Sequence, residues 1–254
     1  MYEIESKPLG PLLKRINFSP PEYVGPIASN EPSPLVLIGL LMANLATADE
    51  FSDAVYKDFN WRLQELSNLK LAVFSSNSAA RPTFLRALVV MCYAHWEGHV
   101  KYCADNFVNF ITIRRLRFSD LSLDFYAIRF VRELGAAGNL GYQGRRDLVR
   151  KIISSHEDRL SAFPRELIDT RSNLNSEVLM QLCMVCNIDF QIEDADSDFI
   201  DRFLLKRRNQ VAHGEAVFID AVDPDQLIAK TTSLMRMFRD LIDNSVAQSS
   251  YRRT

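Results

Sequence analysis

The chain has 254 residues, 47% of them hydrophobic, which is enough apolar material to bury a sizeable core in one large domain or two small ones. Its 30 Lys and Arg residues nearly balance its 32 Asp and Glu residues. The composition therefore excludes a protein whose whole surface is basic, and any site for an anion such as nucleic acid has to be a local patch.

The first residues, MYEIESKPLGPLLKRINF, lack the basic start, apolar run and small-residue cleavage site of a secretion signal. The longest apolar stretch, residues 34–46, is shorter than the roughly 20 residues that cross a bilayer. We therefore expect a cytoplasmic protein that has no membrane partner. Cysteines in such a protein are expected to be thiols: Cys92, Cys103, Cys183 and Cys186.

Proline divides the chain into two parts. Seven of the 10 prolines fall within residues 1–34, which predicts an extended N-terminal arm. Beyond this arm the apolar residues recur at helical spacing, so residues 35–254 are predicted to form a single all-α domain, a helical bundle.

The first half of this domain is predicted to contain four helices. A long helix or a broken pair covers about 35–72 and is followed by the breaking sequence SSNSAARP, and a second long helix runs from after Pro82 to about Ile113. Shorter helices are predicted at about 125–134 and 145–156. The second helix has an apolar stripe with steps of three and four residues: Leu85, Val89, Cys92, Trp96, Val100, Cys103 and Phe107.

The second half continues the helical pattern. Asn175 is a suitable cap for a helix at about 176–186, and a further helix at about 197–213 ends at Gly214. A short extended piece is predicted at 216–221. Asp223 and Pro224 then open the last helix as its cap and its first-turn proline.

Arg208 and His213 lie near the end of the 197–213 helix, and two interpretations are open. Cations complement the negative end of a helix dipole, so the pair is explained by local electrostatics alone. Alternatively, the pair serves RNA cleavage, in which histidine transfers protons near neutral pH and arginine's planar fork binds phosphate oxygens. Because one histidine cannot fill both proton roles, a two-fold dimer would supply the second pair.

The fuller string KRRNQVAHGE, residues 206–215, resembles the C-terminal signature of the HEPN superfamily. Two further blocks, YAHWEGHVKYCADNF at 93–107 and RSNLNSEVL at 171–179, are similar to a stand-alone bacterial branch of MAE-type HEPN-like nucleases. The resemblance covers about 45–220 in three blocks that follow the expected order.

The resemblance implies a helical bundle that forms a homodimer, with the Arg and His of both chains in a cleft at the interface. It implies a metal-independent endoribonuclease that needs no cofactor and acts as a toxin or in phage defence, often beside an antitoxin protein. Arg208 would be the transition-state cation and His213 the base or acid, and Asn209 would position the RNA or His213. Glu97 would either orient the arginine or be a solvated surface glutamate. The chain has Glu215 where one toxin branch carries a tyrosine that its antitoxin modifies.

Basic residues outside the pair are candidates for contacts with RNA phosphates. Lys206 and Arg207 precede Arg208, and Arg145 and Arg146 follow a loop that contains Gly135, Gly138, Gly141 and Gly144. A mobile connection between helices is the competing interpretation of that loop.

His95 and His99, one turn apart, would suit zinc only if further ligands came from elsewhere, and we expect no metal site. Two other functions stay open. One is a catalytically inactive HEPN module that binds RNA, a nucleotide or a partner protein, and the other is a helical scaffold in which Arg208 and His213 only cap a helix.

Overall fold

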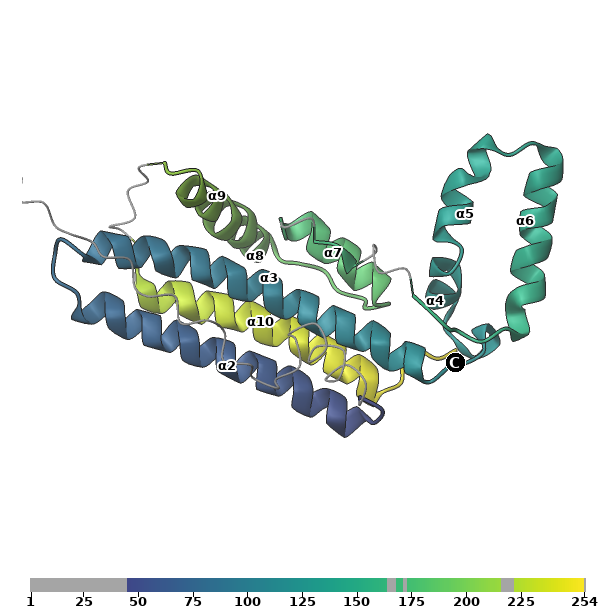
Figure 1. Ribbon diagram of the computed structural model, residues 1–254, viewed down its shortest axis with the longest axis horizontal. Coiled ribbons are helices and arrows are strands. Elements are labelled where there is room, and N and C mark those ends of the chain that lie inside the picture. Colours follow the sequence, from purple (N-terminus) through teal and green to yellow (C-terminus); the bar gives the residue numbers. More distant parts are fainter. Residues whose placement is uncertain (1–44, 164–167, 171–172, 216–221, 254) are drawn as a thin grey trace, which may run out of the picture.

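The structure is a computed structural model that describes residues 45–163, 168–170, 173–215 and 222–253. Three long helices lie side by side and form its main bundle (Figure 1). They are α2 (Ala48–Ser75), α3 (Arg81–Ile113) and α10 (Pro224–Ala247). Each of the three packs against the other two, so the last helix of the chain completes a bundle that the first two begin.

Local sequence explains where these helices begin. Thr47 and Glu50 form a reciprocal capping box at the start of α2, with 3.1 Å from Glu50 N to Thr47 Oγ1 and 2.9 Å from Thr47 N to Glu50 Oε2. Asp223 caps α10 through the N–H of Asp225 at 2.9 Å, and Pro224 occupies the first turn as predicted. Residues 35–44 of the first predicted helix lie outside the described residues.

Helix α3 is the centre of the core. All seven residues of its predicted apolar stripe are buried, including Trp96 and Phe107 with no exposed surface. Pro82 lies in the first turn of this helix, which begins at Arg81. The helix packs against α2 and α10 on one side and against the segment that contains α9 on the other, so it is buried on both sides.

The single helix predicted at 125–134 is wrong, because the structure has two short helices there. These are α4 (Leu123–Ile128) and α5 (Val131–Ala136), separated at Phe130, whose side chain is only 2% exposed. The ring of Phe130 packs edge-on against that of Tyr126, with 5.7 Å between centroids. A two-residue turn at Arg129 and Phe130 thus separates the two helices.

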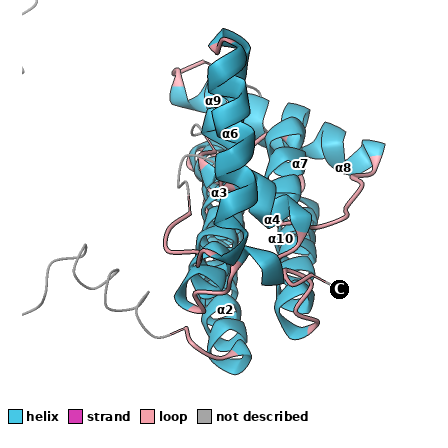
Figure 2. Cartoon of the chain, turned by 90° about the vertical axis from the view of Figure 1, so that its right-hand side faces the viewer, coloured by secondary structure: helices cyan, strands magenta, loops and turns pink. Residues whose placement is uncertain are grey.

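The predicted helix at 145–156 starts three residues earlier, as α6 (Tyr142–Ser154), after a short 3₁₀ turn, η2 (Ala137–Asn139). It is followed by a second 3₁₀ turn, η3 (Ser155–Glu157). Another 3₁₀ turn, η1 (Phe118–Asp120), precedes α4. Helices α4 to α6 project together from one end of the bundle, and Figure 1 and the end view in Figure 2 show this lateral extension.

The helix predicted at 176–186 is confirmed as α7 (Ser176–Val185), whose cap Asn175 accepts from Val178 N at 2.7 Å. The helix predicted at 197–213 begins earlier and is not uniform. It consists of α8 (Asp194–Asp198), a π-helical segment η5 (Phe199–Leu205) and α9 (Lys206–Ala212). In the π segment the N–H of Lys206 bonds to the carbonyl of Asp201, five residues back.

The all-α fold is confirmed. The regular elements among the described residues are α-, 3₁₀- and π-helices, and the β pairing in the same residues consists of two isolated bridges. In the same ranges, no helix has the length and apolar character needed to cross a membrane. The proposed arm at 1–34, the domain boundary at residue 35 and the extended piece at 216–221 all lie outside the described residues.

Candidate functional site

Helix α9 ends in a Schellman motif that fixes the backbone at His213. Gly214 has a φ of +75°, and its N–H donates to the carbonyl of Val211 at 3.1 Å. The N–H of Glu215 donates to the carbonyl of Gln210 at 3.0 Å, which completes the motif. A glycine is needed at this left-handed position, and it leaves the side chain of His213 exposed at the helix end.

The end of α9 is also tied to the central helix. Arg86 of α3 donates from Nη1 to the carbonyl oxygen of Glu215 at 2.8 Å. Together with the glycine cap, this contact holds the exposed His213 at a fixed place beside the first turns of α3.

Arg208 lies on a different side of α9, against α3. Its Cζ is 4.3 Å from the centroid of the Tyr93 ring, and Nη2 is 3.8 Å from Glu97 Oε2. Its Nη1 donates to Asn209 Oδ1 at 2.7 Å. The side chains of Arg208 and Glu97 are 22% and 17% exposed. The guanidinium is therefore held on one face and still reachable by solvent.

Tyr93 connects this arginine to a third segment. Its hydroxyl accepts a hydrogen bond from the backbone N–H of Leu174 at 2.7 Å. Burial, with the negative charge of Glu97, raises the pKa of Tyr93 to about 12, so the ring beneath Arg208 stays neutral at physiological pH. The three sequence blocks that resemble HEPN proteins thus meet around one arginine, because 93–107 supplies Tyr93 and Glu97, 171–179 supplies Leu174, and 206–215 supplies Arg208.

Asn209 contacts the arginine rather than the histidine ring. Its side chain accepts from Arg208, and its backbone carbonyl accepts the N–H of His213 at 2.9 Å as part of the helix. Glu97 has a second carboxylate oxygen, Oε1, that is buried and has no hydrogen-bond partner among the described residues. The seat of Arg208, which consists of Tyr93, Glu97 and Asn209, therefore includes one acceptor oxygen that receives no hydrogen bond from the described residues.

Arg208 and His213 do not face the same way within one chain. Five residues of α-helix separate them by about 140° around the axis and by about 7.5 Å along it. Arg208 faces α3 while His213 is exposed beyond the last turn. A single chain thus presents one arginine and one histidine on adjacent sides of a helix end.

The remaining basic candidates occupy two places. Lys206 is exposed on α9, and Arg207 lies over the ring of Phe203, with Cζ 3.8 Å from the centroid. Arg145 and Arg146 are on α6, in the lateral extension of α4 to α6 at the opposite end of the bundle from α9 (Figure 1). The structure therefore does not bring these two arginines together with Arg208.

The local contacts of the two α6 arginines differ. Arg145 donates from Nε to the carbonyl of Leu140 at 2.9 Å and from Nη2 to that of Gly138 at 3.3 Å. These bonds close the glycine-containing loop before α6. Arg146 Nε lies 3.9 Å from Asp147 Oδ1 on an exposed surface.

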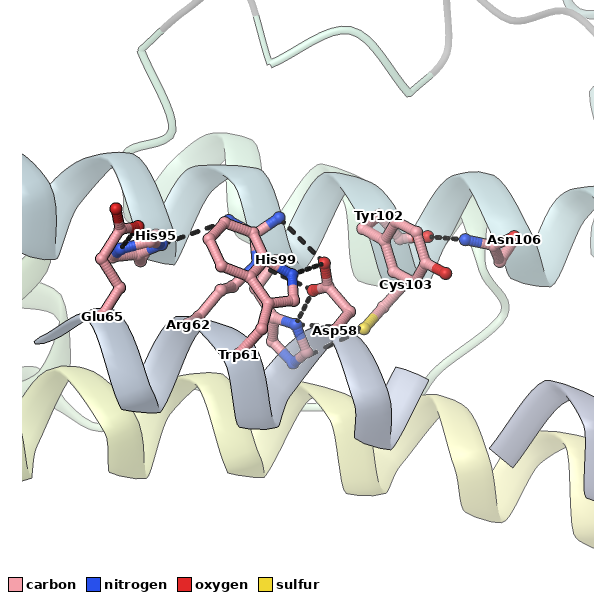
Figure 3. Close-up of polar contacts among 9 residues, drawn as sticks. All are labelled: Asp58, Trp61, Arg62, Glu65, His95, His99, Tyr102, Cys103 and Asn106. Atoms are coloured by element: carbon pink, nitrogen blue, oxygen red, sulfur yellow. Dashed lines mark hydrogen bonds and ion pairs between the residues drawn. The ribbon is translucent and has the colours of Figure 1, made fainter. Parts of the chain in front are cut away.

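A second polar cluster lies on the opposite side of α3, between α3 and α2 (Figure 3). Asp58 is its centre, and its carboxylate accepts from Arg62 Nε at 2.8 Å and from Trp61 Nε1 at 3.0 Å, and meets His99 Nδ1 at 2.6 Å. His95 Nε2 is 2.9 Å from Glu65 Oε2, an ion-pair distance without the angle of an aligned hydrogen bond. Both histidines of the HWEGH sequence therefore pair with carboxylates of α2.

The glycine in HWEGH has a steric role in this cluster. A Cβ atom at Gly98 would lie 2.6 Å from Nη1 of Arg62, so a side chain at this position would force the guanidinium to move from its present place. Glu97 and Tyr93 point to α9, while His95 and His99 point to α2. The sequence motif thus describes a helix with a different polar partner on each side.

Burial and the surrounding charges shift the pKa values of this cluster. Burial acts to raise the pKa of Asp58, but hydrogen bonds from His99 and Arg62 outweigh it and hold the pKa below its ordinary value. Burial lowers the pKa of His99, and the cations Arg62 and Arg239 add to this effect against Asp58. Burial and Arg62 likewise lower the pKa of His95. The folded protein therefore favours neutral histidines beside an ionised Asp58.

Sequence reasoning did not find Asp58, Arg62 and Glu65. The only local signal was an acid and a base one turn apart on α2, a spacing common on solvated helix faces. In the described parts of the chain, no group of three or more His, Cys, Asp or Glu side chains is arranged to hold a metal ion. All four cysteines are buried thiols.

These features define a class of protein, an all-helical bundle in which an Arg and a His near one helix end adjoin a central helix that carries a Tyr and a Glu. A family model described as HEPN_MAE_28990, MAE_28990-like HEPN, matches residues 51–251. The chain belongs to this HEPN family. Comparison with curated proteins and with solved structures gives no significant match.

Proposed function

We propose that this HEPN protein is a metal-independent endoribonuclease that cleaves RNA by attack of a 2′-hydroxyl on the adjacent phosphate. The observation that carries the proposal is the seat of Arg208, which residues from all three motif blocks build, five residues before an exposed His213. Such a seat holds a guanidinium in place before substrate arrives, which is what electrostatic stabilisation of a transition state needs.

In this reaction a histidine removes the proton of the 2′-hydroxyl, whose oxygen attacks phosphorus. Arg208 stabilises the extra negative charge on the pentavalent phosphorane. A second acid protonates the leaving 5′-oxygen as its bond to phosphorus breaks. The products are a 2′,3′-cyclic phosphate and a free 5′-hydroxyl, and no oxidant or metal enters the balance.

A homodimer supplies the second proton-transfer group. Each chain offers one histidine at the end of α9, and that histidine faces solvent rather than its own Arg208. Two helix ends that meet about a two-fold axis place one His213 as base and the other as acid, with an arginine from each chain on the phosphate. In this arrangement Asn209 and Glu97 hold Arg208, and Lys206 contacts RNA phosphates beside the scissile bond.

The cellular role that fits a free-standing nuclease of this kind is a toxin or phage-defence effector in the cytoplasm. A partner protein, an antitoxin or another defence component, would restrain it. Since position 215 is a glutamate, restraint by modification of a tyrosine at that position does not apply.

The test is cleavage of total RNA and of tRNA in EDTA by the full chain, compared with His213→Ala and Arg208→Ala. We expect both substitutions to lower the cleavage rate by about 100-fold or more, because each removes a group needed in the transition state. His156→Ala and Arg202→Ala are matched controls, since both side chains are exposed outside this site. Circular dichroism and light scattering establish that every variant is folded and dimeric.

The outcomes separate the proposal from its alternatives. Loss of cleavage in both site variants, with the controls unaffected, supports the nuclease. RNA binding without cleavage by the wild type would make the inactive HEPN module the better account. Cleavage that persists in His213→Ala, or that needs an added divalent metal, would overturn the mechanism.

A further inference from the structure

Two phenylalanines and an arginine form a column along the helix that carries the site. The rings of Phe199 and Phe203 are nearly parallel, with 13° between their planes and 5.4 Å between centroids. The guanidinium of Arg207 continues the column, since its Cζ lies 3.8 Å from the centre of the Phe203 ring. Three groups with flat faces are thus stacked one turn apart.

This column is not what anchors the helix to the bundle. The neighbouring stripe, Ile200 and Leu204, is fully buried and provides the anchor. Phe199 and Phe203 are only half-buried and lie at the edge of the core. A helix already held by two buried aliphatic residues keeps two aromatic rings partly open to solvent beside them.

The column ends next to the proposed reaction centre. Arg207 precedes Arg208 in sequence, but the two guanidinium groups leave the helix in different directions. Arg208 turns toward Tyr93 and Glu97 of α3, while Arg207 folds back along its own helix onto Phe203. Burial also lowers the pKa of Arg207, which is consistent with a guanidinium that has lost part of its water.

Flat, weakly hydrated groups of this kind are suited to the faces of nucleobases. Unpaired bases stack on phenylalanine rings and on arginine planes, whereas bases in a duplex have both faces covered. A nucleotide whose phosphate meets Arg208 has its sugar and base within a short distance of residue 207. We propose that the outer face of the Arg207 guanidinium, which Phe203 and Phe199 support from the other side, is a stacking subsite for an unpaired RNA base next to the scissile phosphate.

This inference rests on the proposed function, because it places the column relative to the phosphate that Arg208 binds. It makes the protein selective for single-stranded or looped RNA. It also assigns Arg207 a role that its charge alone would not give it, since a lysine at this position would keep the charge and lose the flat face.

The test measures RNA affinity without cleavage. The full chain carrying His213→Ala is titrated into a short fluorescent single-stranded RNA, into the same RNA as a duplex, and into an abasic ribose-phosphate oligomer of equal length. In that background, Phe203→Ala, Arg207→Ala and Arg207→Lys are compared with Arg202→Ala. Arg202 is a matched control because it lies on the same helix, is 79% exposed and pairs only at the surface, with Asp198.

Stacking predicts that Arg207→Ala and Arg207→Lys both weaken binding to single-stranded RNA by about tenfold, and that Phe203→Ala does the same. Affinity for the duplex and the abasic oligomer should change less than about twofold, as should all affinities in Arg202→Ala. Arg207→Lys is a surface change that keeps the fold testable if Phe203→Ala proves unstable.

Three results would overturn the subsite. Wild-type affinity in Arg207→Lys would mean that residue 207 acts as a point charge on phosphate. Unchanged affinity in all three variants would mean that the column only packs, and failure to bind single-stranded RNA at all would remove its ligand. Each result is independent of the cleavage assay, so loss of the subsite and loss of the nuclease are distinguishable.

Discussion

Replacement of Asp58 by asparagine should destabilise the protein strongly. The carboxylate is 7% exposed and accepts from Arg62, which is 11% exposed, from Trp61 and from the fully buried His99. Asparagine removes the charge and puts an amide donor where two donor groups already point. Breaking a buried ion pair from one side typically costs about 3–5 kcal/mol, and asparagine keeps one acceptor oxygen, so we expect about 3 kcal/mol.

The assay is urea unfolding of the full chain near neutral pH, followed by far-ultraviolet circular dichroism at a fixed protein concentration. Asp53→Asn is the control, since Asp53 is an exposed residue of the same helix. It should change the free energy of unfolding by less than about 0.5 kcal/mol. Combining Asp58→Asn with Arg62→Met should cost at least about 1 kcal/mol less than the sum of the single changes, because the arginine is no longer left without its partner.

A loss below about 1 kcal/mol for Asp58→Asn would refute this reasoning, because it would lie within the range of an ordinary neutral hydrogen bond. Strict additivity in the double variant would refute it separately. In that case the aspartate and the arginine would contribute to stability without interacting.

Three further predictions concern pH, the helix cap and the tyrosine. The free energy of unfolding should fall as the pH drops below about 6.5, the ordinary value for histidine, because the unfolded chain then binds protons that the folded cluster resists. His99→Gln should flatten this slope in urea titrations across pH, while exposed His156→Gln should not. Gly214→Ala forces a side chain into a φ of +75° and should cost about 1 kcal/mol in the same assay, with slower RNA cleavage. Tyr93→Phe removes the oxygen that accepts the N–H of Leu174 and should lower the free energy of unfolding by about 1–3 kcal/mol. It should slow RNA cleavage by the folded protein much less than Arg208→Ala does, because the phenyl ring still supports the guanidinium, and a loss as large as that of Arg208→Ala would contradict this assignment.

Local sequence patterns were sufficient for much of the fold. The spacing of apolar residues identified α3 and its buried stripe, and cap residues located the starts of α7 and α10. These features depend on neighbours within one or two turns, which the sequence displays directly. The break at Phe130 was missed because the packing of that ring against Tyr126 is not visible in the spacing of apolar residues.

The polar partners of α3 illustrate what periodicity leaves out. Asp58 and His99 are 41 residues apart, and no local rule pairs a carboxylate on one helix with a histidine on the next. The close approach of Arg62 to Gly98 of HWEGH is identifiable only with both helices in place. On the other side of α3, the motif resemblance indicated Glu97, and the structure places it against Arg208.

The π-helical segment Phe199–Leu205 determines in which direction around the helix axis the side chains of α9 point. Residues four apart in an α-helix point in directions that differ by about 40°, and the wider π turn compensates for this difference. Ile200, Leu204 and Arg208, each four residues from the next, therefore all face the bundle. Because a π turn holds one residue more than an α turn, deletion of one residue here is absorbed when the segment tightens to an α-helix, whereas insertion of one residue between this segment and Arg208 would rotate the end of the helix by about 100°. Arg208 would leave Tyr93 with every motif residue still present. The length of the chain before the motif is therefore as much a part of this site as the residues within it.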